Sequence, residues 1–231
     1  MESYTDFIAT HYQAYRPPLH ALILEKCLGE ERYSRTLDVG CGTGVSSFEL
    51  TKFSDRVLGY DISKVMLEKT ISHPNVTYSQ DIPQDFSCDL ICYFGSINYI
   101  KKEEVTTQLD YLQVGGKVIC CDFQVLFDQF LQIIPIQPEF NGYNHKKNLS
   151  FYGLGNLKQL SIKNELSHFF CSCNQAAHLL LSDSTLLNGL PTYFELKNPY
   201  DALVHKLRKT YPSNRIRFAV ICYFSSYEKY E

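Results

Sequence analysis

Three glycines at alternate positions, Gly40, Gly42 and Gly44, follow an apolar run and precede residues 45–50, where we expect a helix. A turn built from residues without a Cβ atom lets the backbone approach a ligand closely. A second apolar run ends at Asp61. A carboxylate at the end of such a strand can accept hydrogen bonds from both hydroxyls of a ribose. The pattern therefore predicts a binding site for a ligand that contains a ribose.

The spacing of the glycines argues against a dinucleotide. The dinucleotide fingerprint G-x-G-x-x-G would need glycine at position 45, where this chain has Val45. A pyrophosphate binds close to a free helix N-terminus, and a ligand without phosphate does not need that approach. Two alternatives stay open, a nicotinamide cofactor and a turn with only a structural role.

Strands and helices alternate over the first half of the chain. The run 89–94 is continuously apolar, as expected of a strand buried on both faces. The alternation predicts an α/β fold with an open, mainly parallel sheet and helices on both faces. We expect helices at 17–29, 45–53, 63–71 and 103–112, and strands at 36–39, 57–60, 76–79, 89–94 and 117–121, the last after a turn at 115–116.

The second half of the chain is less regular. A strong strand pattern at 216–224 follows a helix pattern at 199–211. With a strand around 192–196, this pattern predicts an antiparallel hairpin that closes the sheet. The remaining expectations are a helix at 126–133, a loop at 135–156 and, from an ambiguous pattern, a helix at 157–168.

The composition excludes several classes of function. Of 231 residues, 45% are hydrophobic and 20% are charged, which suits one compact domain. The net charge of −3 gives a nucleic acid no electrostatic attraction, so no nucleic-acid partner is expected. No apolar run approaches the roughly 18 residues of a membrane span, and the polar N-terminus is unlike a signal peptide. We expect a cytoplasmic protein without membrane association.

Most of the nine cysteines lie in apolar runs, where a free thiol behaves as a small buried hydrophobe. Cys171 and Cys173 are separated by a single residue, which is too close for the usual zinc spacing. We therefore expect neither a metal site nor a disulfide framework.

Five segments, in order, resemble the motifs of class I methyltransferases that use S-adenosylmethionine. They are 37–44, 59–67, 78–82, 88–93 and 114–118. Residues 12–17 are similar to the lead-in of a small-molecule subfamily, methyltransferase type 11, that includes trans-aconitate methyltransferase-like proteins. The resemblance implies a Rossmann-like sheet of seven strands, mostly parallel, with an antiparallel C-terminal strand, and S-adenosyl-L-methionine as the cofactor.

The resemblance also implies an organisation and a set of cofactor contacts. We expect a single domain over 1–231, with an N-terminal lid and helix at 1–30, a cofactor-binding core at 31–125, an acceptor-side insertion at about 126–190 and a C-terminal hairpin at 191–231. The expected contacts are Tyr12 and Arg16 in the lid, Gly40, Cys41 and Gly42 at the amino-acid part, Asp61 at the ribose, Ile62, Met66, Asp81 and Ile82 at the adenine, and Tyr93 and Ser96 at the methionine end.

The acceptor is expected to be a small molecule that receives the methyl group on a carboxylate, hydroxyl or amine by in-line SN2 displacement. A general base is needed only for acceptors of high pKa. No motif identifies a catalytic residue or an oligomeric state, and the candidate catalytic residues are His145, Tyr143 and Asn98. The pair Asn98–Tyr99 replaces the His-Trp pair common in the trans-aconitate group, which argues against that substrate. The alternative is a catalytically silent protein that binds S-adenosylmethionine as a sensor or partner subunit.

Overall fold

The structure is a computed structural model, which describes residues 10–11, 14–131, 133, 142–183, 186 and 198–230. The chain divides into two compact units. Unit 1 comprises 1–18, 125–143 and 166–221, and unit 2 comprises 19–124, 144–165 and 222–231.

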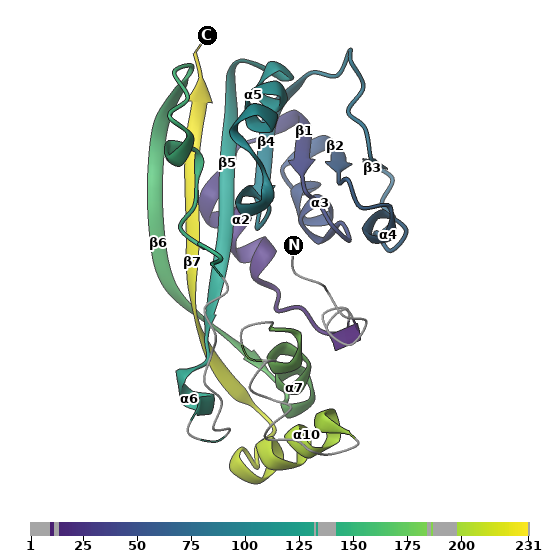
Figure 1. Ribbon diagram of the computed structural model, residues 1–231, viewed down its shortest axis with the longest axis vertical. Coiled ribbons are helices and arrows are strands. Elements are labelled where there is room, and N and C mark those ends of the chain that lie inside the picture. Colours follow the sequence, from purple (N-terminus) through teal and green to yellow (C-terminus); the bar gives the residue numbers. More distant parts are fainter. Residues whose placement is uncertain are drawn as a thin grey trace. The chain divides into compact units, whose positions relative to one another are not determined.

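One sheet of seven strands organises the chain (Figure 1). The strands are β1 (Tyr33–Val39), β2 (Ser54–Tyr60), β3 (Val76–Ser79), β4 (Cys88–Phe94), β5 (Leu112–Leu126), β6 (Leu157–Cys171) and β7 (Ile216–Lys229). Their order is β3-β2-β1-β4-β5-β7-β6. Strands β1 to β5 pair in parallel, and the C-terminal strand β7 is antiparallel. The Rossmann-like α/β fold is therefore confirmed.

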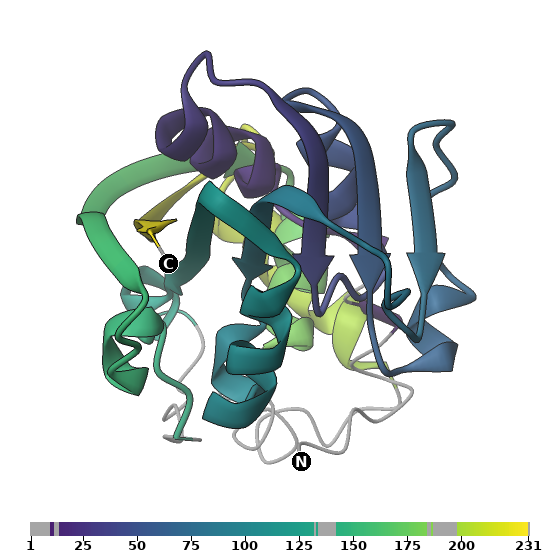
Figure 2. The same ribbon diagram turned by 90° about the horizontal axis from the view of Figure 1, so that it is seen from above.

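Helices cover both faces of the sheet in unit 2. Figure 2 shows α2 (Leu19–Leu28) and α3 (Val45–Leu50) on one side, and α5 (Lys102–Asp110) on the other. The remaining elements are α4 (Lys64–Leu67), α6 (Asp128–Leu131), α7 (Cys173–Ser182), α10 (Pro199–Thr210) and the 3₁₀ helices η1 (Ile97–Tyr99) and η2 (Leu149–Tyr152). None of the described helices is both long and apolar enough to cross a membrane.

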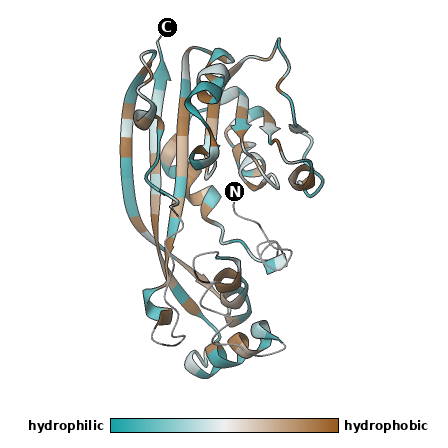
Figure 3. Cartoon of the chain, in the orientation of Figure 1, coloured by the Kyte–Doolittle hydropathy of each residue, from teal (hydrophilic) through white to brown (hydrophobic). Residues whose placement is uncertain are grey.

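The segment 157–168 is not a helix, because it belongs to the long strand β6. Its inward positions include polar residues with partners in the fold: Ser161 hydrogen-bonds to Ser226, and Glu165 forms an ion pair with Lys26. These polar residues interrupt the apolar alternation that would have predicted a strand, as the mixed colours along β6 show (Figure 3). The neighbour of β7 on its outer side is β6, and the expected strand at 192–196 lies outside the described residues.

Among the boundaries that differ from the expectations, two lie at the ends of β5. The glycines at 115–116 lie inside β5, which begins at Leu112 and is irregular where it first pairs with β4. The helix expected at 126–133 is the short α6. Both differences make β5 longer than expected. Because β5 pairs in parallel with β4, the carboxyl ends of both strands point toward the edge of the sheet where the candidate site lies.

The ring of Tyr78 on β3 packs against the backbone of Gly59, in space that a side chain at position 59 would occupy. A Cβ atom on Gly59 of β2 would lie 2.6 Å from Cδ1 of Tyr78 and 2.9 Å from Oγ of Ser47. The Tyr78 hydroxyl donates to the carbonyl oxygen of Ile71 at 2.9 Å, which holds the ring in place. Tyr78 therefore links β3 to β2 through a contact that excludes any larger residue at position 59.

Gly59→Ala is expected to destabilise the fold by about 1–3 kcal/mol, since the added methyl group forces the Tyr78 ring or the backbone to move. Urea unfolding followed by circular dichroism measures the effect. Gly155→Ala is the matched control, because a Cβ atom there meets open space. Equal unfolding free energies of the two variants would contradict this packing argument.

Candidate functional site

The glycine turn after β1 is held against the end of β2. The N–H groups of Gly40 and Cys41 both donate to the carbonyl oxygen of Tyr60, at 2.7 and 3.1 Å. Gly40, Gly42 and Gly44 have φ angles of 70°, 55° and 81°, a region that favours glycine. The turn is thus a preformed stretch of backbone rather than a loose loop.

Ser96 closes one side of this turn. Its Oγ donates to the carbonyl oxygen of Val39 at 2.5 Å. A Cβ atom on Gly40 would lie 2.5 Å from the Cβ of Ser96, so glycine is required at this contact. The segment after β4 therefore lies directly on the end of β1, and the role of Ser96 at the methionine end stays a prediction.

Asp61 lies beside the turn. Its carboxylate accepts a hydrogen bond from the N–H of Gly42 on Oδ2 and another from the N–H of Ser63 on Oδ1, both at 2.8 Å. A carboxylate offers about four acceptor positions, and these two backbone bonds use half of them. Asp61 can therefore orient the turn and still accept hydrogen bonds from a ligand.

Asp38 is fully buried beneath the turn. Its Oδ2 accepts hydrogen bonds from the hydroxyls of Ser46 and Ser47, at 2.7 and 2.6 Å. Burial raises the pKa of Asp38 to about 6, although the two serines act in the opposite direction. Burial, together with Asp38 and Asp61, also raises the pKa of the Cys41 thiol. Cys41 is thus a neutral part of the turn and not a nucleophile.

Apolar side chains lie at the edge of the site next to β2 and β3. Ile62 is 78% exposed, which is unusual for a large apolar residue, and its carbonyl oxygen accepts a hydrogen bond from Gln80. The terminal methyl of Met66 is the atom nearest to the Cβ position of Gly42. Ile82 packs against the core, and Asp81 is exposed. An exposed apolar surface of this kind can cover a flat aromatic ligand group.

Tyr93, expected at the methionine end of the cofactor, lies on the buried strand β4. Its side chain is fully buried in the core, and its hydroxyl donates to Oε1 of Gln108 on α5 at 2.8 Å. Side chains alternate along a strand, and Phe94, the next residue, stacks on His20 instead. The Tyr93 side chain therefore points into the core, and its contact with the methionine end of a ligand stays a prediction.

The structure does not give the position of three predicted site residues relative to the turn. Tyr12 lies outside the described residues. Arg16 and Tyr143, both partly buried, belong to unit 1, whereas the turn belongs to unit 2. Their assigned roles stay predictions.

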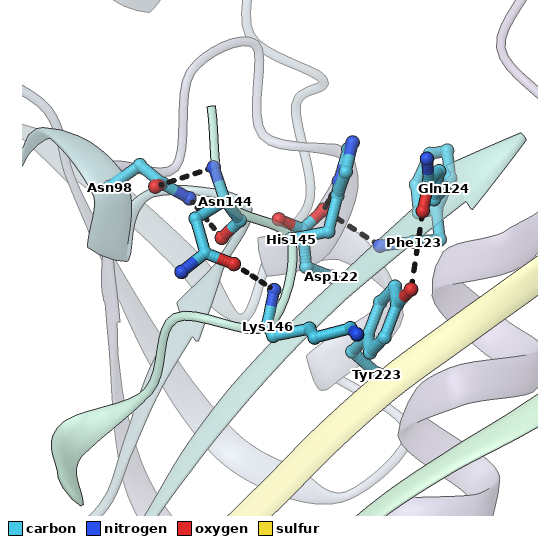
Figure 4. A network of polar contacts seen from close by, with 8 residues as sticks. All are labelled: Asn98, Asp122, Phe123, Gln124, Asn144, His145, Lys146 and Tyr223. Atoms are coloured by element: carbon cyan, nitrogen blue, oxygen red, sulfur yellow. Dashed lines mark hydrogen bonds and ion pairs between the residues drawn. The ribbon is translucent and has the colours of Figure 1, made fainter. Parts of the chain in front are cut away.

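Two of the candidate catalytic residues, Asn98 and His145, are linked within unit 2 through Asn144 (Figure 4). The side chain of Asn98 donates to the carbonyl oxygen of Asn144 at 3.0 Å and accepts from its N–H at 3.2 Å. The next residue, His145, places Nδ1 3.4 Å from Oδ1 of Asp122, and its ring lies parallel to that of Tyr223. Asp122 and Tyr223 were not among the residues predicted for the site. An acidic residue directly after the apolar run of β5 was the available signal for Asp122.

Residues 36–116 match a family model that describes a methyltransferase domain. These residues form a methyltransferase domain. It contains the glycine turn, Asp61 and Ser96. No curated protein sequence matches the chain.

The fold of the whole chain is similar to that of solved structures. A putative type II methyltransferase from Anaeromyxobacter dehalogenans aligns with a TM-score of 0.63 and 15% identity over 94% of this chain and 98% of that one. Phosphoethanolamine N-methyltransferase 2 from Haemonchus contortus aligns with a TM-score of 0.55 and 20% identity, over 100% of this chain and 58% of that one. The [4+2]-cyclase SpnF aligns with a TM-score of 0.50 and 16% identity over 91% and 80%. At these identities the similarity shows the fold.

The buried Asp38 predicts a pH dependence of stability. Because its folded-state pKa is raised, the protonated form favours folding, and the stability it contributes decreases as the pH rises from about 4 to about 6. Relative to Asp38→Asn, the wild type should lose about 2 kcal/mol between about pH 4.5 and about pH 7.5. Urea unfolding of both proteins across this range measures the difference. A relative stability that increases with pH would contradict the prediction.

Proposed function

We propose that the chain is an S-adenosyl-L-methionine-dependent methyltransferase that acts on a small-molecule acceptor. The observation that carries this proposal is the glycine turn with the Asp61 carboxylate bonded to Gly42, inside the methyltransferase domain. We also propose that residues 1–231 act as one methyltransferase domain.

The chemistry of the residues around the turn fits this cofactor. Asp61 retains acceptor positions for the two hydroxyls of the ribose, and carboxylate–hydroxyl bonds are charge-assisted. The exposed apolar surface beside it suits an adenine ring. The proposed contacts are the backbone of Gly40, Cys41 and Gly42, the carboxylates of Asp61 and Asp81, the side chains of Ile62, Met66, Ile82 and Ser96, and Tyr12 and Arg16 from the N-terminal segment.

S-adenosyl-L-methionine, when bound, supplies a methyl group activated by a sulfonium. The chain's part is to hold the acceptor in line with the bond that breaks and to exclude water. Ser96, two residues after the end of β4, lies next to the turn and precedes η1 as its N-cap, so this segment is the one best placed to orient the acceptor.

We also propose the cellular compartment of the protein and the class of its acceptor. All nine cysteines are free thiols, which suits a reducing compartment such as the cytoplasm. The net charge of −3 does not favour a nucleic-acid acceptor. A small molecule is therefore the acceptor that we propose.

Asp61→Ala is expected to weaken binding of S-adenosylhomocysteine at least about tenfold, since a charged hydrogen bond contributes about 1.5–3 kcal/mol. Isothermal titration calorimetry measures the affinity. Asp55→Ala, on the exposed side of the same strand β2, is the matched control and should bind as the wild type does. Unchanged affinity in Asp61→Ala would refute the role of this carboxylate.

A thermal-shift assay tests the choice of cofactor. S-adenosylhomocysteine should raise the melting temperature, because a ligand that binds only the folded state stabilises it, and NAD should not. Stabilisation by NAD alone would exclude the proposed function. Cofactor binding without methyl transfer to any pool of small metabolites would contradict its catalytic part.

A further inference from the structure

A pocket of about 310 Å³ lies in unit 2, bordered by β5, β6, β7 and the residues that precede and form η2. Its lining combines two features that have not yet been given a role. One is the pair Asp122–His145, and the other is a group of three lysines, Lys146, Lys147 and Lys163.

The pair has the arrangement of a positioned base. Asp122 is 8% exposed, and its Oδ1 accepts a hydrogen bond from the N–H of Phe123 at 2.7 Å while lying 3.4 Å from Nδ1 of His145. The Tyr223 ring lies nearly parallel to the imidazole, at an interplanar angle of 13°. A carboxylate beside Nδ1 can orient the imidazole and leave Nε2 available to a ligand.

Short links connect this pair to the glycine turn. The N–H of Gly95 donates to the carbonyl oxygen of Cys121 at 2.8 Å, so Asp122 directly follows the residue that is bonded to the end of β4. The residue after Gly95 is Ser96, which lies against Gly40. The segment Gly95–Ser96 therefore lies between Asp122 and the glycine turn and contacts the neighbourhood of both.

The charge of the pocket is predominantly positive. The lining contains three lysines and one carboxylate, that of Asp122. The Lys147 ammonium is anchored, since it donates to the carbonyl oxygen of Asn98 at 3.3 Å and lies 5.2 Å from the centre of the Tyr152 ring. Lys146 and Lys163 are exposed at the lining. A pocket of this charge attracts an anionic group.

We propose that this pocket binds the methyl acceptor, and that the acceptor combines an amine or hydroxyl with an anionic group. This inference rests on the proposed function. His145 is the general base, Asp122 is its positioning residue, and Lys146 and Lys163 bind the anion.

The presence of a general base distinguishes between the possible classes of acceptor. A carboxylate is already ionised near neutral pH and needs no base, whereas an amine or hydroxyl carries a proton that must leave. The acceptor nitrogen or oxygen loses that proton to Nε2 of His145 and bonds to the methyl carbon. The electron pair of the broken S–C bond stays on sulfur, which becomes neutral.

The anion subsite is tested without turnover. Inorganic phosphate is titrated into the full chain loaded with S-adenosylhomocysteine, and binding is measured by calorimetry. Lys163→Gln should weaken phosphate binding at least fivefold, and Lys158→Gln, on the same strand but outside the pocket, should leave it unchanged. Absence of phosphate binding, or an equal effect of both variants, would overturn the anion subsite.

The base is tested with two acceptor pools, anionic amines and alcohols in one, and carboxylic acids without amine or hydroxyl in the other. Radiolabelled methyl groups should enter the first pool only. The transfer rate should fall at acidic pH in the wild type, and His145→Gln should lower it at least about a hundredfold and abolish this pH dependence. His168→Gln, on β6 outside the pocket, is the control.

The outcomes separate this inference from the proposed function. Methyl transfer to the second pool, or an unchanged pH profile in His145→Gln, overturns the inference while the methyltransferase function stands. Failure of the wild type to bind S-adenosylhomocysteine would overturn the function, and phosphate titrated into the unloaded chain would still report on the pocket. Each variant is checked by its melting temperature and its affinity for S-adenosylhomocysteine, and Asp122→Asn gives a second test of the pair with an intact imidazole.

Discussion

The carbonyl oxygen of Tyr60, which accepts hydrogen bonds from Gly40 and Cys41, is the contact on which the candidate site depends. It ties the turn after β1 to the last residue of β2, so Asp61, the next residue, necessarily lies beside Gly42. Parallel pairing brings the carboxyl ends of β1, β2 and β4 to one edge of the sheet. Ligands of open α/β sheets bind at this edge. The site is therefore a direct result of the register of three strands.

Burial assigns different tasks to the two acidic residues of the turn. Asp38 has no access to solvent, and its hydrogen bonds to Ser46 and Ser47 attach the start of α3 to the end of β1. Asp61 is only partly buried, and its bonds to backbone N–H groups leave positions for a ligand. The buried acid supports the turn from beneath, and the accessible one is available for recognition.

The parts of the site that are local in sequence could be predicted, and the parts that depend on long-range contacts could not. The glycine turn and Asp61 are close along the chain, so their spacing indicated their arrangement. Asp122 and His145 are separated by 22 residues that include part of unit 1, and only the fold brings them together. The direction of the Tyr93 side chain could not be predicted, because β4 is buried on both faces and its apolar sequence does not show which side chain faces which side.

The ring of Tyr78 occupies space next to both Gly44 and Gly59, on two different segments of the chain. These three positions therefore form one sterically coupled group. A smaller residue at 78 would open space at both glycines, so a substitution that is harmful on its own at 59 becomes tolerable after a change at 78. Mutational effects at these positions should consequently be non-additive. In evolutionary terms, related chains should exchange Tyr78 and Gly59 together, whereas Gly44, with its φ angle of 81°, should stay glycine.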